Sequence, residues 1–355
     1  MKPRLSWLLL TLVFSLHLAA QPTTGLPEKI DKYLLQHFSE AGPGGVVLVA
    51  KGDEIILRKA YGLANESLQQ KNTPETIFRI GSITKQFTST AILRLARAGK
   101  LSLQDTITKF LPGYPMGDKP ITITHLLTHT SGIKSYTSLP QLVGSKESKE
   151  KAYSVNEVIA AFKGEPKDFA PGEDYRYNNS GYYLLGAIIE KVSGVAWGDY
   201  LATHFFKPLG MSSTYCNDLG IMGEATGYYK NRKKYNVADV VHPSASYAAG
   251  AMASTVDDLW KWNKAVFSGE VEGFDLLQIA WRPVRLNNGV TKPYGFGWQI
   301  SGEGNGRRIG HGGTIDGFQS FAWYVPESKI FVVILSNNMG ANPGEYANEI
   351  LSMMK

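Results

Sequence analysis

Ser82 and Lys85 are separated by two residues and directly precede an amphipathic run with Phe87 and Ala91 at helical spacing. If a helix begins near Ser82, Lys85 lies one turn further on the same face. A serine at a helix N-terminus has backbone N–H groups and a positive dipole end near its oxygen, which favours a developing oxyanion. A nearby, partly desolvated amine can lose its proton and activate the hydroxyl. This stretch therefore predicts a nucleophile and its base.

The Ser-x-x-Lys spacing is not specific by itself. It also occurs at Ser131…Lys134 and Ser148…Lys151, but only the Ser82 copy lies directly before a long amphipathic helix, which ends at Gly99. The alternative interpretation is a helix-capping serine beside a solvated lysine. Two further stretches bear on the choice.

Tyr177 and Asn179 form the second stretch, between a Pro171-Gly172 turn and an apolar helix expected over residues 181–190. A phenol close to a serine–lysine pair can relay a proton, and an amide beside it can hold a substrate carbonyl. The same Tyr-x-Asn pattern occurs at Tyr215, Tyr229 and Tyr346. The prediction for Tyr177 therefore rests on its position between a turn and an apolar helix. A packing tyrosine with a capping asparagine is the alternative.

The third stretch runs from His311 through two glycines to Thr314, at the edge of an expected strand. Glycines allow a ligand to approach the backbone closely, and a strand edge offers free N–H groups. A glycine turn beside a structural histidine is equally compatible with the residues. The three stretches can act together only if the fold brings them together.

Strand patterns lie at both ends of the chain and helical patterns in the middle. A β-hairpin is expected over residues 45–61, and further strands are expected over 296–300, 308–310, 318–325 and 330–336, with a closing helix at 345–353. This order predicts an α+β fold in which an antiparallel sheet is built from both chain ends, with flanking helices and an inserted, mostly helical lobe. We expect one catalytic domain over 21–355, with an α/β lobe at about 27–100 and 245–355 and a helical lobe at about 101–244. The polar segment 135–154 is expected to be mostly loop.

Composition and the N-terminus limit the possible partners and the compartment. The net charge is +6, but no dense Lys/Arg cluster is present, so nucleic acid is an unexpected partner. Residues 1–20 resemble a secretory signal, with Lys2 and Arg4 before an apolar run and Ala19-Ala20 as the cleavage site. The apolar run is shorter than the roughly 20 residues of a membrane-spanning helix, which favours cleavage over an uncleaved anchor. We expect a periplasmic or secreted protein without stable membrane insertion after cleavage; whether cleavage occurs and the oligomeric state stay open.

In their order, the three stretches resemble the serine β-lactamase and penicillin-binding protein superfamily, in its class C-like branch. That branch includes D-alanyl-D-alanine carboxypeptidases, D-amino-acid peptidases and carboxylesterases. His311-Gly312-Gly313 stands where many members carry Lys-Thr-Gly. Framework segments extend the resemblance over nearly all of the chain from Ile30 onward, at residues 121–132, 208–211, 249–258 and 294–298.

The resemblance implies that Ser82 attacks a carbonyl and forms an acyl-enzyme, which water then hydrolyses. It implies that Lys85 and Tyr177 share the acid–base work and that Asn179 holds the substrate or the lysine. The N–H groups of Ser82 and Thr314 would form an oxyanion hole, with His311 and Gly313 also lining the substrate site. No metal or organic cofactor is implied.

His311 departs from the family pattern, because a histidine titrates near neutral pH whereas a lysine would carry a fixed charge suited to a substrate carboxylate. The resulting hypothesis is a serine hydrolase that acts on β-lactam or D-alanyl-peptide substrates. A carboxylesterase with little β-lactam activity is the alternative enzyme. A catalytically idle protein that binds cell-wall peptides is the alternative from another class, although binding alone needs no activated nucleophile.

Overall fold

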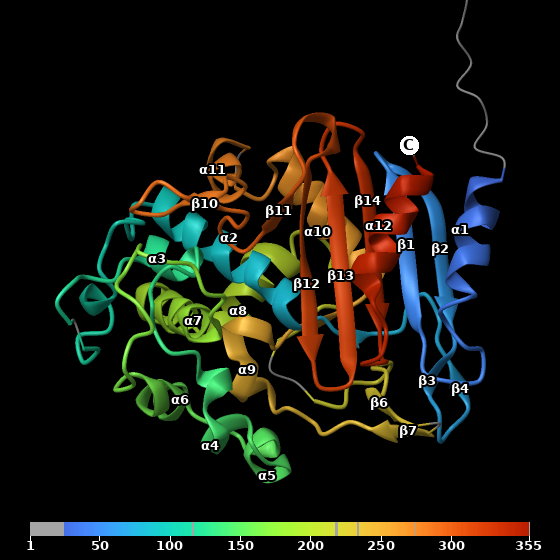
Figure 1. Ribbon diagram of the computed structural model, residues 1–355, viewed down its shortest axis with the longest axis horizontal. Helices are drawn as coiled ribbons and strands as arrows, with labels where there is room; N and C mark the ends of the chain where they lie inside the picture. The colour runs from blue at the N-terminus through green and yellow to red at the C-terminus, as the bar shows by residue number, and fades with distance from the viewer. Residues whose placement is uncertain (1–24, 116, 217–218, 233, 273, 355) are drawn as a thin grey trace, which may run out of the picture.

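A six-stranded antiparallel sheet forms the centre of the computed structural model, which describes residues 25–115, 117–216, 219–232, 234–272 and 274–354 (Figure 1). The strand order is β11-β12-β13-β14-β1-β2. The bounds are β1 (Gly45–Lys51), β2 (Glu54–Tyr61), β11 (Gln299–Ser301), β12 (Arg308–Ile315), β13 (Phe318–Val325) and β14 (Ile330–Ser336). The expected signal segment 1–20 lies outside the described residues.

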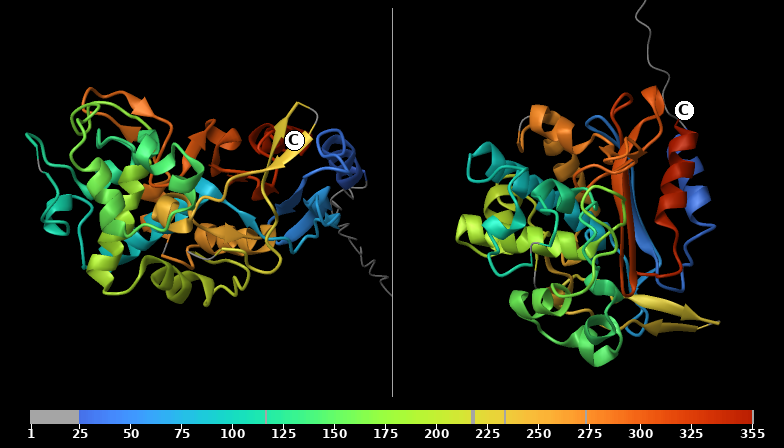
Figure 2. Two further views of the ribbon diagram at one scale, coloured as in Figure 1. Left: turned by 90° about the horizontal axis from the view of Figure 1, so that it is seen from below. Right: turned by 60° about the vertical axis from the view of Figure 1, so that its left-hand side comes forward.

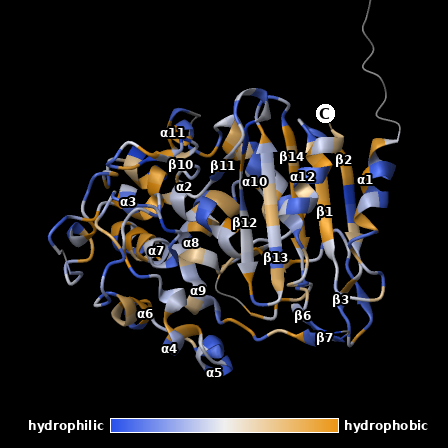
Figure 3. Cartoon of the chain, in the orientation of Figure 1, coloured by the Kyte–Doolittle hydropathy of each residue, from blue (hydrophilic) through white to orange (hydrophobic). Residues whose placement is uncertain are grey.

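The two ends of the chain meet where β1 pairs with β14, in a register that runs from Gly45 opposite Ser336 to Lys51 opposite Ile330. Both strands are rich in valine, isoleucine and leucine, which gives them the hydrophobic colour in Figure 3. Except for Lys51, their residues are buried on both faces of the sheet. Alternate residues face different cores: Val46 and Leu48 face the helical side, whereas Val47 and Val49 face the opposite side. The α+β architecture and the sheet assembled from both chain ends confirm the prediction.

Helices cover both faces of the sheet (Figure 2). On one face lie α1 (Leu26–Leu34) and α12 (Pro343–Met353), whose Ile30, Leu34 and Ile350 complete the smaller core. On the other face lie α2 (Thr84–Arg97), α7 (Asn179–Ser193), α9 (Pro243–Gly250) and α10 (Val256–Ser268). This second layer carries the larger core and continues into the helical part of the molecule.

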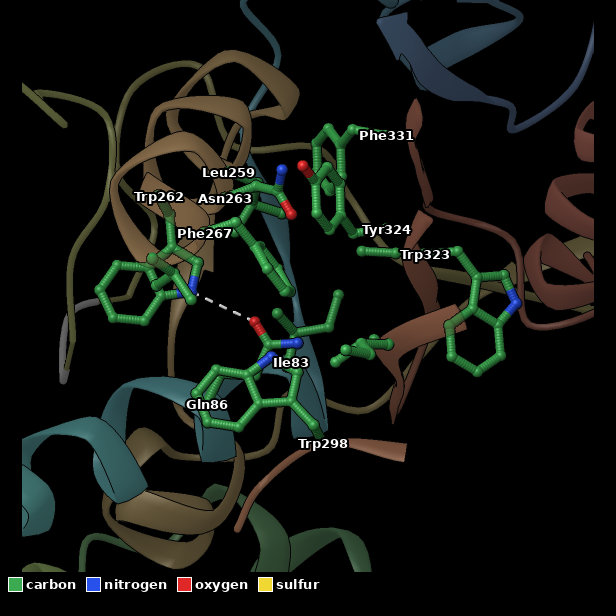
Figure 4. Close-up of a pocket in the computed structure, with 14 residues that line it drawn as sticks. Ile83, Gln86, Leu259, Trp262, Asn263, Phe267, Trp298, Trp323, Tyr324 and Phe331 are labelled. Atoms are coloured by element: carbon green, nitrogen blue, oxygen red, sulfur yellow. Dashed lines mark hydrogen bonds between the residues drawn. The ribbon is translucent and has the colours of Figure 1, made fainter. Parts of the chain in front are cut away.

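The helix α10 packs against the start of α2, and Figure 4 shows the side chains that lie between α10, α2 and the sheet. The Trp262 indole N–H donates to Gln86 Oε1 at 3.2 Å, and the Trp262 ring stacks on Phe87 with centroids 3.9 Å apart. Aromatic burial of this kind stabilises a helix position strongly. The first turn of α2, which carries Lys85 and directly follows the turn that carries Ser82, is therefore packed firmly against α10.

The middle of the chain contains short helices and small two-stranded sheets. The remaining helical elements are η1 (Gly81–Ile83), η2 (Ile107–Lys109), α3 (Ile123–Leu127), η3 (Tyr136–Ser138), α4 (Pro140–Val143), α5 (Lys146–Glu150), α6 (Val155–Phe162), α8 (Trp197–Leu201), η4 (Ala202–Phe206), α11 (Phe274–Ala280) and η5 (Gly304–Gly306). The small sheets pair β3 (Leu63–Asn65) with β4 (Gln70–Lys71), β5 (Phe78–Arg79) with β8 (Ala253–Ser254), β6 (Tyr228–Asn231) with β7 (Lys234–Val237), and β9 (Val284–Arg285) with β10 (Thr291–Lys292). Within the described ranges, no helix is long and apolar enough to cross a membrane.

The expectation of a loop over residues 135–154 is wrong in part, because η3, α4 and α5 lie there. Ser145 caps α5: its side chain accepts from the Ser148 N–H, and the Ser148 side chain bonds back to the backbone of Ser145. Pro140 begins α4, where its missing N–H carries no cost. Both signals were present in the sequence, but neither helix has an apolar periodicity that would have revealed it.

Candidate active site

Ser82 lies in the single turn η1, between β5 and α2, at a position that the two neighbouring segments fix. β5 pairs with β8, and the Ile80 N–H donates to the carbonyl of Met252 at 3.0 Å. The Met252 N–H in turn donates to Thr84 Oγ1 at 3.2 Å. The expectation that a helix begins near Ser82 holds, with one 3-10 turn before the α-helix starts at Thr84.

Lys85 is fully buried and has no acidic partner among the described residues. Its Nζ lies 3.0 Å from Ser82 Oγ, 2.8 Å from Asn179 Oδ1 and 2.8 Å from the carbonyl oxygen of Ala249. Burial lowers the pKa of Lys85 well below its ordinary value, because a charged amine in this position loses its hydration without gaining a counter-ion. The alternative of a solvated lysine is excluded.

The three contacts of Lys85 suit a neutral amine that acts as a base. A neutral amine has two N–H donors and one lone pair. The carbonyl oxygens of Asn179 and Ala249 can accept only, so they take the two N–H groups. The lone pair is then left for the Ser82 hydroxyl, the third contact. This arrangement can remove the proton of Ser82 during attack.

Tyr177 and Asn179 approach the pair from the N-terminus of α7. The Tyr177 ring centroid lies 4.8 Å from Lys85 Nζ. Burial raises the pKa of Tyr177, and a hydrogen bond with Ser82 opposes part of the rise. Its side chain is nevertheless 36% exposed, so water reduces this shift relative to a fully enclosed phenol. The neutral phenol can donate a proton at Ser82, the place where a leaving group would depart.

His129 holds Tyr177 in place, and sequence reasoning missed it. The Arg176 N–H donates to the His129 carbonyl at 3.1 Å, and the Asn178 N–H donates to His129 Nδ1 at 3.1 Å. The residues on both sides of Tyr177 are therefore tied to one buried histidine, whose ring lies 4.4 Å from the Tyr177 ring. His129 has φ of 60°, a left-handed conformation that no sequence pattern of the 121–132 segment reveals.

β12 passes η1 at backbone contact, and two glycines allow it. A Cβ on Gly313 would lie 2.0 Å from the carbonyl oxygen of Ile80, and a Cβ on Gly81 would lie 2.8 Å from the amide nitrogen of Thr314. Gly81 also has φ of 50°. The amide of Thr314 therefore lies beside the turn that carries Ser82, while the Thr314 hydroxyl donates to Gln319 at 2.8 Å. The two chain segments can approach this closely because Gly313 has no side chain.

His311 is buried, contrary to the expectation that it titrates near neutral pH. Its side chain is only 2% exposed; its Nε2 lies 2.8 Å from the Tyr294 hydroxyl and its Nδ1 lies 2.5 Å from the carbonyl oxygen of Gly312. Burial and the nearby Lys85 lower the pKa of His311 to about 3. At neutral pH it is therefore uncharged, with Nδ1–H donating to Gly312 and Nε2 accepting from Tyr294.

In the other two Ser-x-x-Lys copies, the lysine lies at the surface in an ion pair, although Ser131 itself is buried. Lys134 pairs with Asp168 at 3.3 Å, and Lys151 pairs with Glu157 at 3.4 Å. Neither lysine is desolvated as Lys85 is. The structure thus brings Ser82, Lys85, Tyr177, Asn179 and Thr314 together, from η1, α2, the start of α7 and β12.

Ser82 opens onto two adjoining cavities. One, of about 350 Å³, lies between α9, α5 and the end of β12. The other, of about 550 Å³, includes Tyr177 and His311. Ser82, Asn179 and Thr314 line both, so a substrate carbonyl over Ser82 would have one substituent in each cavity. No group of three or more histidine, cysteine or acidic side chains in the described part of the chain is placed to hold a metal ion.

The site thus combines a buried lysine, hydrogen-bonded to a serine one turn away, with a tyrosine and an asparagine at the start of a second helix. The model of the Beta-lactamase family matches residues 32–351. The chain belongs to this family. It is thus related to serine hydrolases that include amidases, penicillin-binding proteins and β-lactamases.

Individual relatives of this β-lactamase family member are distant. Penicillin-binding protein 4* of Bacillus subtilis is 30% identical over 325 residues, covering 86% of this chain. The chain spans 64% to 70% of the length of the first curated relatives it matches. A penicillin-binding protein homologue from Pyrococcus abyssi superposes with a TM-score of 0.81 at 29% identity, over 94% of this chain and 77% of its own. D-amino acid amidase from Ochrobactrum anthropi SV3 superposes with a TM-score of 0.79 at 26% identity, over 93% of this chain and 98% of its own.

Proposed function

We propose that this protein is a serine hydrolase that works through an acyl-enzyme on Ser82. The observation that carries the proposal is the buried, counter-ion-free Lys85, whose Nζ lies 3.0 Å from Ser82 Oγ. Binding a ligand needs no such amine, and burying it costs stability. This argues against the catalytically idle binding protein.

In the proposed reaction, Lys85 takes the proton of Ser82 as its Oγ attacks the substrate carbonyl. The amides of Ser82 and Thr314 would stabilise the oxyanion, each such donor contributing roughly 3 kcal/mol in comparable sites. Tyr177 would deliver a proton to the leaving atom, breaking the C–N or C–O bond and leaving the acyl group on Ser82. Lys85 would return its proton to the Tyr177 phenolate. Water would then attack the acyl carbon and give its proton to Lys85, which would pass it to Ser82 Oγ as the acyl–oxygen bond breaks and the carboxylic acid leaves.

The proposed substrates are β-lactams or D-alanyl-type amides and peptides, with small esters as the alternative. Solved relatives of both kinds support this range, since one is a penicillin-binding protein homologue and another a D-amino acid amidase. We further propose export to the periplasm or the medium, on the basis of the signal-like residues 1–20.

The deciding experiment incubates the protein with a chromogenic cephalosporin, a short-chain nitrophenyl ester and a D-Ala-D-Ala peptide, and follows acylation by intact mass. We expect an adduct that maps to the Ser82 peptide. Ser82→Ala should lower turnover at least about a thousandfold, because nothing else in the site can replace the nucleophile. Ser102→Ala, at an exposed serine, is the control. Turnover that survives in Ser82→Ala would refute the mechanism.

A further inference from the structure

The cavity on the Tyr177 side of Ser82 has no fixed charge. Among the described residues that line it there is no lysine, arginine, aspartate or glutamate; its polar groups are hydroxyls and amides, such as those of Gln299 and Asn342. His311 is uncharged, with both ring nitrogens engaged by Tyr294 and Gly312. The Thr314 hydroxyl is engaged by Gln319. A substrate carboxylate here would lose hydration and meet no cation.

Tyr177 shows which half of a substrate this uncharged cavity receives. Tyr177 lines only this cavity, whereas Ser82, Asn179 and Thr314 line both. The group that protonates the leaving atom must lie on the side to which that atom departs. The uncharged cavity is therefore the leaving-group side, and the cavity beneath α5 receives the acyl group.

The acyl-side cavity has apolar walls and a charged end. Val143 and Ala245 are among its apolar wall residues, and Lys149 and Asp316 are its only charged lining residues in the described chain. Lys149 Nζ lies 2.7 Å from Asp316 and 3.2 Å from Asp239, so one ammonium faces two carboxylates and the cluster has a net charge of −1. Arg79 and Glu224, which line a neighbouring cavity together with Asp239 and Asp316, form a buried pair that is neutral overall.

We infer that the site selects substrates whose acyl group carries a free ammonium and whose leaving group is uncharged, that is, aminoacyl amides and esters in preference to substrates with a carboxylate at either end. This inference rests on the proposed function. An ammonium near Asp316 meets the excess negative charge, whereas a carboxylate there must compete with Asp239 and Asp316 for Lys149. The carboxylate at a free peptide C-terminus would meet no positively charged side chain among the described residues that line the cavity at His311.

The first test compares matched substrates. For the leaving group, D-alanyl-D-alaninamide is compared with D-alanyl-D-alanine; for the acyl group, D-alanine p-nitroanilide is compared with its N-acetyl and N-succinyl derivatives. We expect kcat/KM for D-alanyl-D-alaninamide to exceed that for D-alanyl-D-alanine by about 10-fold or more. Among the p-nitroanilides, we expect kcat/KM to be highest for the free ammonium form, lower for the N-acetyl derivative and lowest for the N-succinyl derivative. A preference for the free acid or the succinyl derivative would overturn the inference.

The second test uses variants with effects of opposite sign. The quantity compared is the ratio of kcat/KM for D-alanine p-nitroanilide to kcat/KM for its N-acetyl derivative. Asp316→Asn removes the excess negative charge and should lower this ratio by about 3- to 10-fold. Lys149→Met removes the positive charge and should raise the ratio by a similar factor. Damage to the cavity would move both ratios in one direction, and that outcome would contradict the inference. Lys146→Met, on the same helix but in an exposed pair with Glu150, is the matched control and should leave the ratio unchanged.

The two proposals fail in different ways. Ser82-dependent turnover with the wrong charge preference leaves the acyl-enzyme mechanism standing and overturns only the selectivity. Turnover of these substrates that is independent of Ser82 overturns both. If none of them is turned over but the cephalosporin or the nitrophenyl ester still acylates Ser82, only the selectivity is overturned.

Discussion

At the scale of single residues, the protonation state of His311 follows from its burial. The folded protein holds His311 neutral because burial lowers its pKa to about 3, whereas the unfolded chain protonates it below about pH 6.5. Between these values the unfolded state binds more protons at this residue, so the contribution of His311 to the free energy of unfolding rises with pH up to about 6.5 and is level above it. A lysine at this position, as in Lys-Thr-Gly relatives, has an ordinary pKa far above this pH range. It would not make the free energy of unfolding depend on pH in this way.

His311→Gln tests this directly, because glutamine can still accept from Tyr294 but does not titrate. We expect the slope of unfolding free energy against pH, measured by urea denaturation between pH 4.5 and 6.5, to fall by up to about 1.4 kcal/mol per pH unit. His37→Gln makes the same substitution at an exposed position and is the control. An unchanged slope in His311→Gln would mean that His311 is not held neutral by folding.

At the scale of elements, His129 joins the end of α3 to the loop before α7. Its backbone and side chain accept from the N–H groups of Arg176 and Asn178, so it fixes the peptide that carries Tyr177. We expect His129→Ala to lower kcat by about 10- to 100-fold with little change in KM, because a misplaced acid costs rate rather than binding.

His129→Asn separates positioning from simple damage. Asparagine tolerates positive φ and its side-chain oxygen can accept from the Asn178 N–H, so it should recover part of the lost kcat. Circular dichroism and thermal unfolding establish that both variants fold. If kcat is the same in both variants, or if KM carries the whole effect, His129 does not position Tyr177.

The elements also show where sequence reasoning ends. The sequence predicts β13 and β14 with their observed bounds because each is a strongly apolar run that ends at turn residues. It does not predict α5, which has no buried residue and is held by caps and by Lys149. It cannot predict the positive φ of His129 or the neutrality of His311, since both depend on segments that are remote in sequence. Ser82, Lys85, Tyr177 and Asn179 could be named from spacing and family resemblance, but their contacts could not.

At the scale of the whole molecule, the sheet divides the protein into two cores with different roles. The larger core supports η1, α2 and α7, which carry the catalytic side chains. The smaller core, between the sheet and helices α1 and α12, lies on the opposite face of the sheet from α2 and α7 (Figure 2). Because β1 and β14 pair residues from the two chain ends, this smaller core closes the fold. Only its edge reaches the site, where Phe321 and Ala341 line the leaving-group cavity, and Ile350 is not among the residues that line it.

Ile350→Ala should therefore reduce stability without changing catalysis. Ile350 is fully buried in the smaller core, and truncating such a side chain costs about 2 to 5 kcal/mol, depending on how far the cavity collapses. Urea unfolding measures this loss, and kcat of the folded variant should equal that of the parent protein. Leu35→Ala, at a side chain that is 47% exposed on the same face, should stay within about 0.5 kcal/mol. A fall in kcat in Ile350→Ala below the unfolding transition would show that packing on the far face reaches the site through β14 and β13, and the two cores would then have to be treated as one mechanical unit.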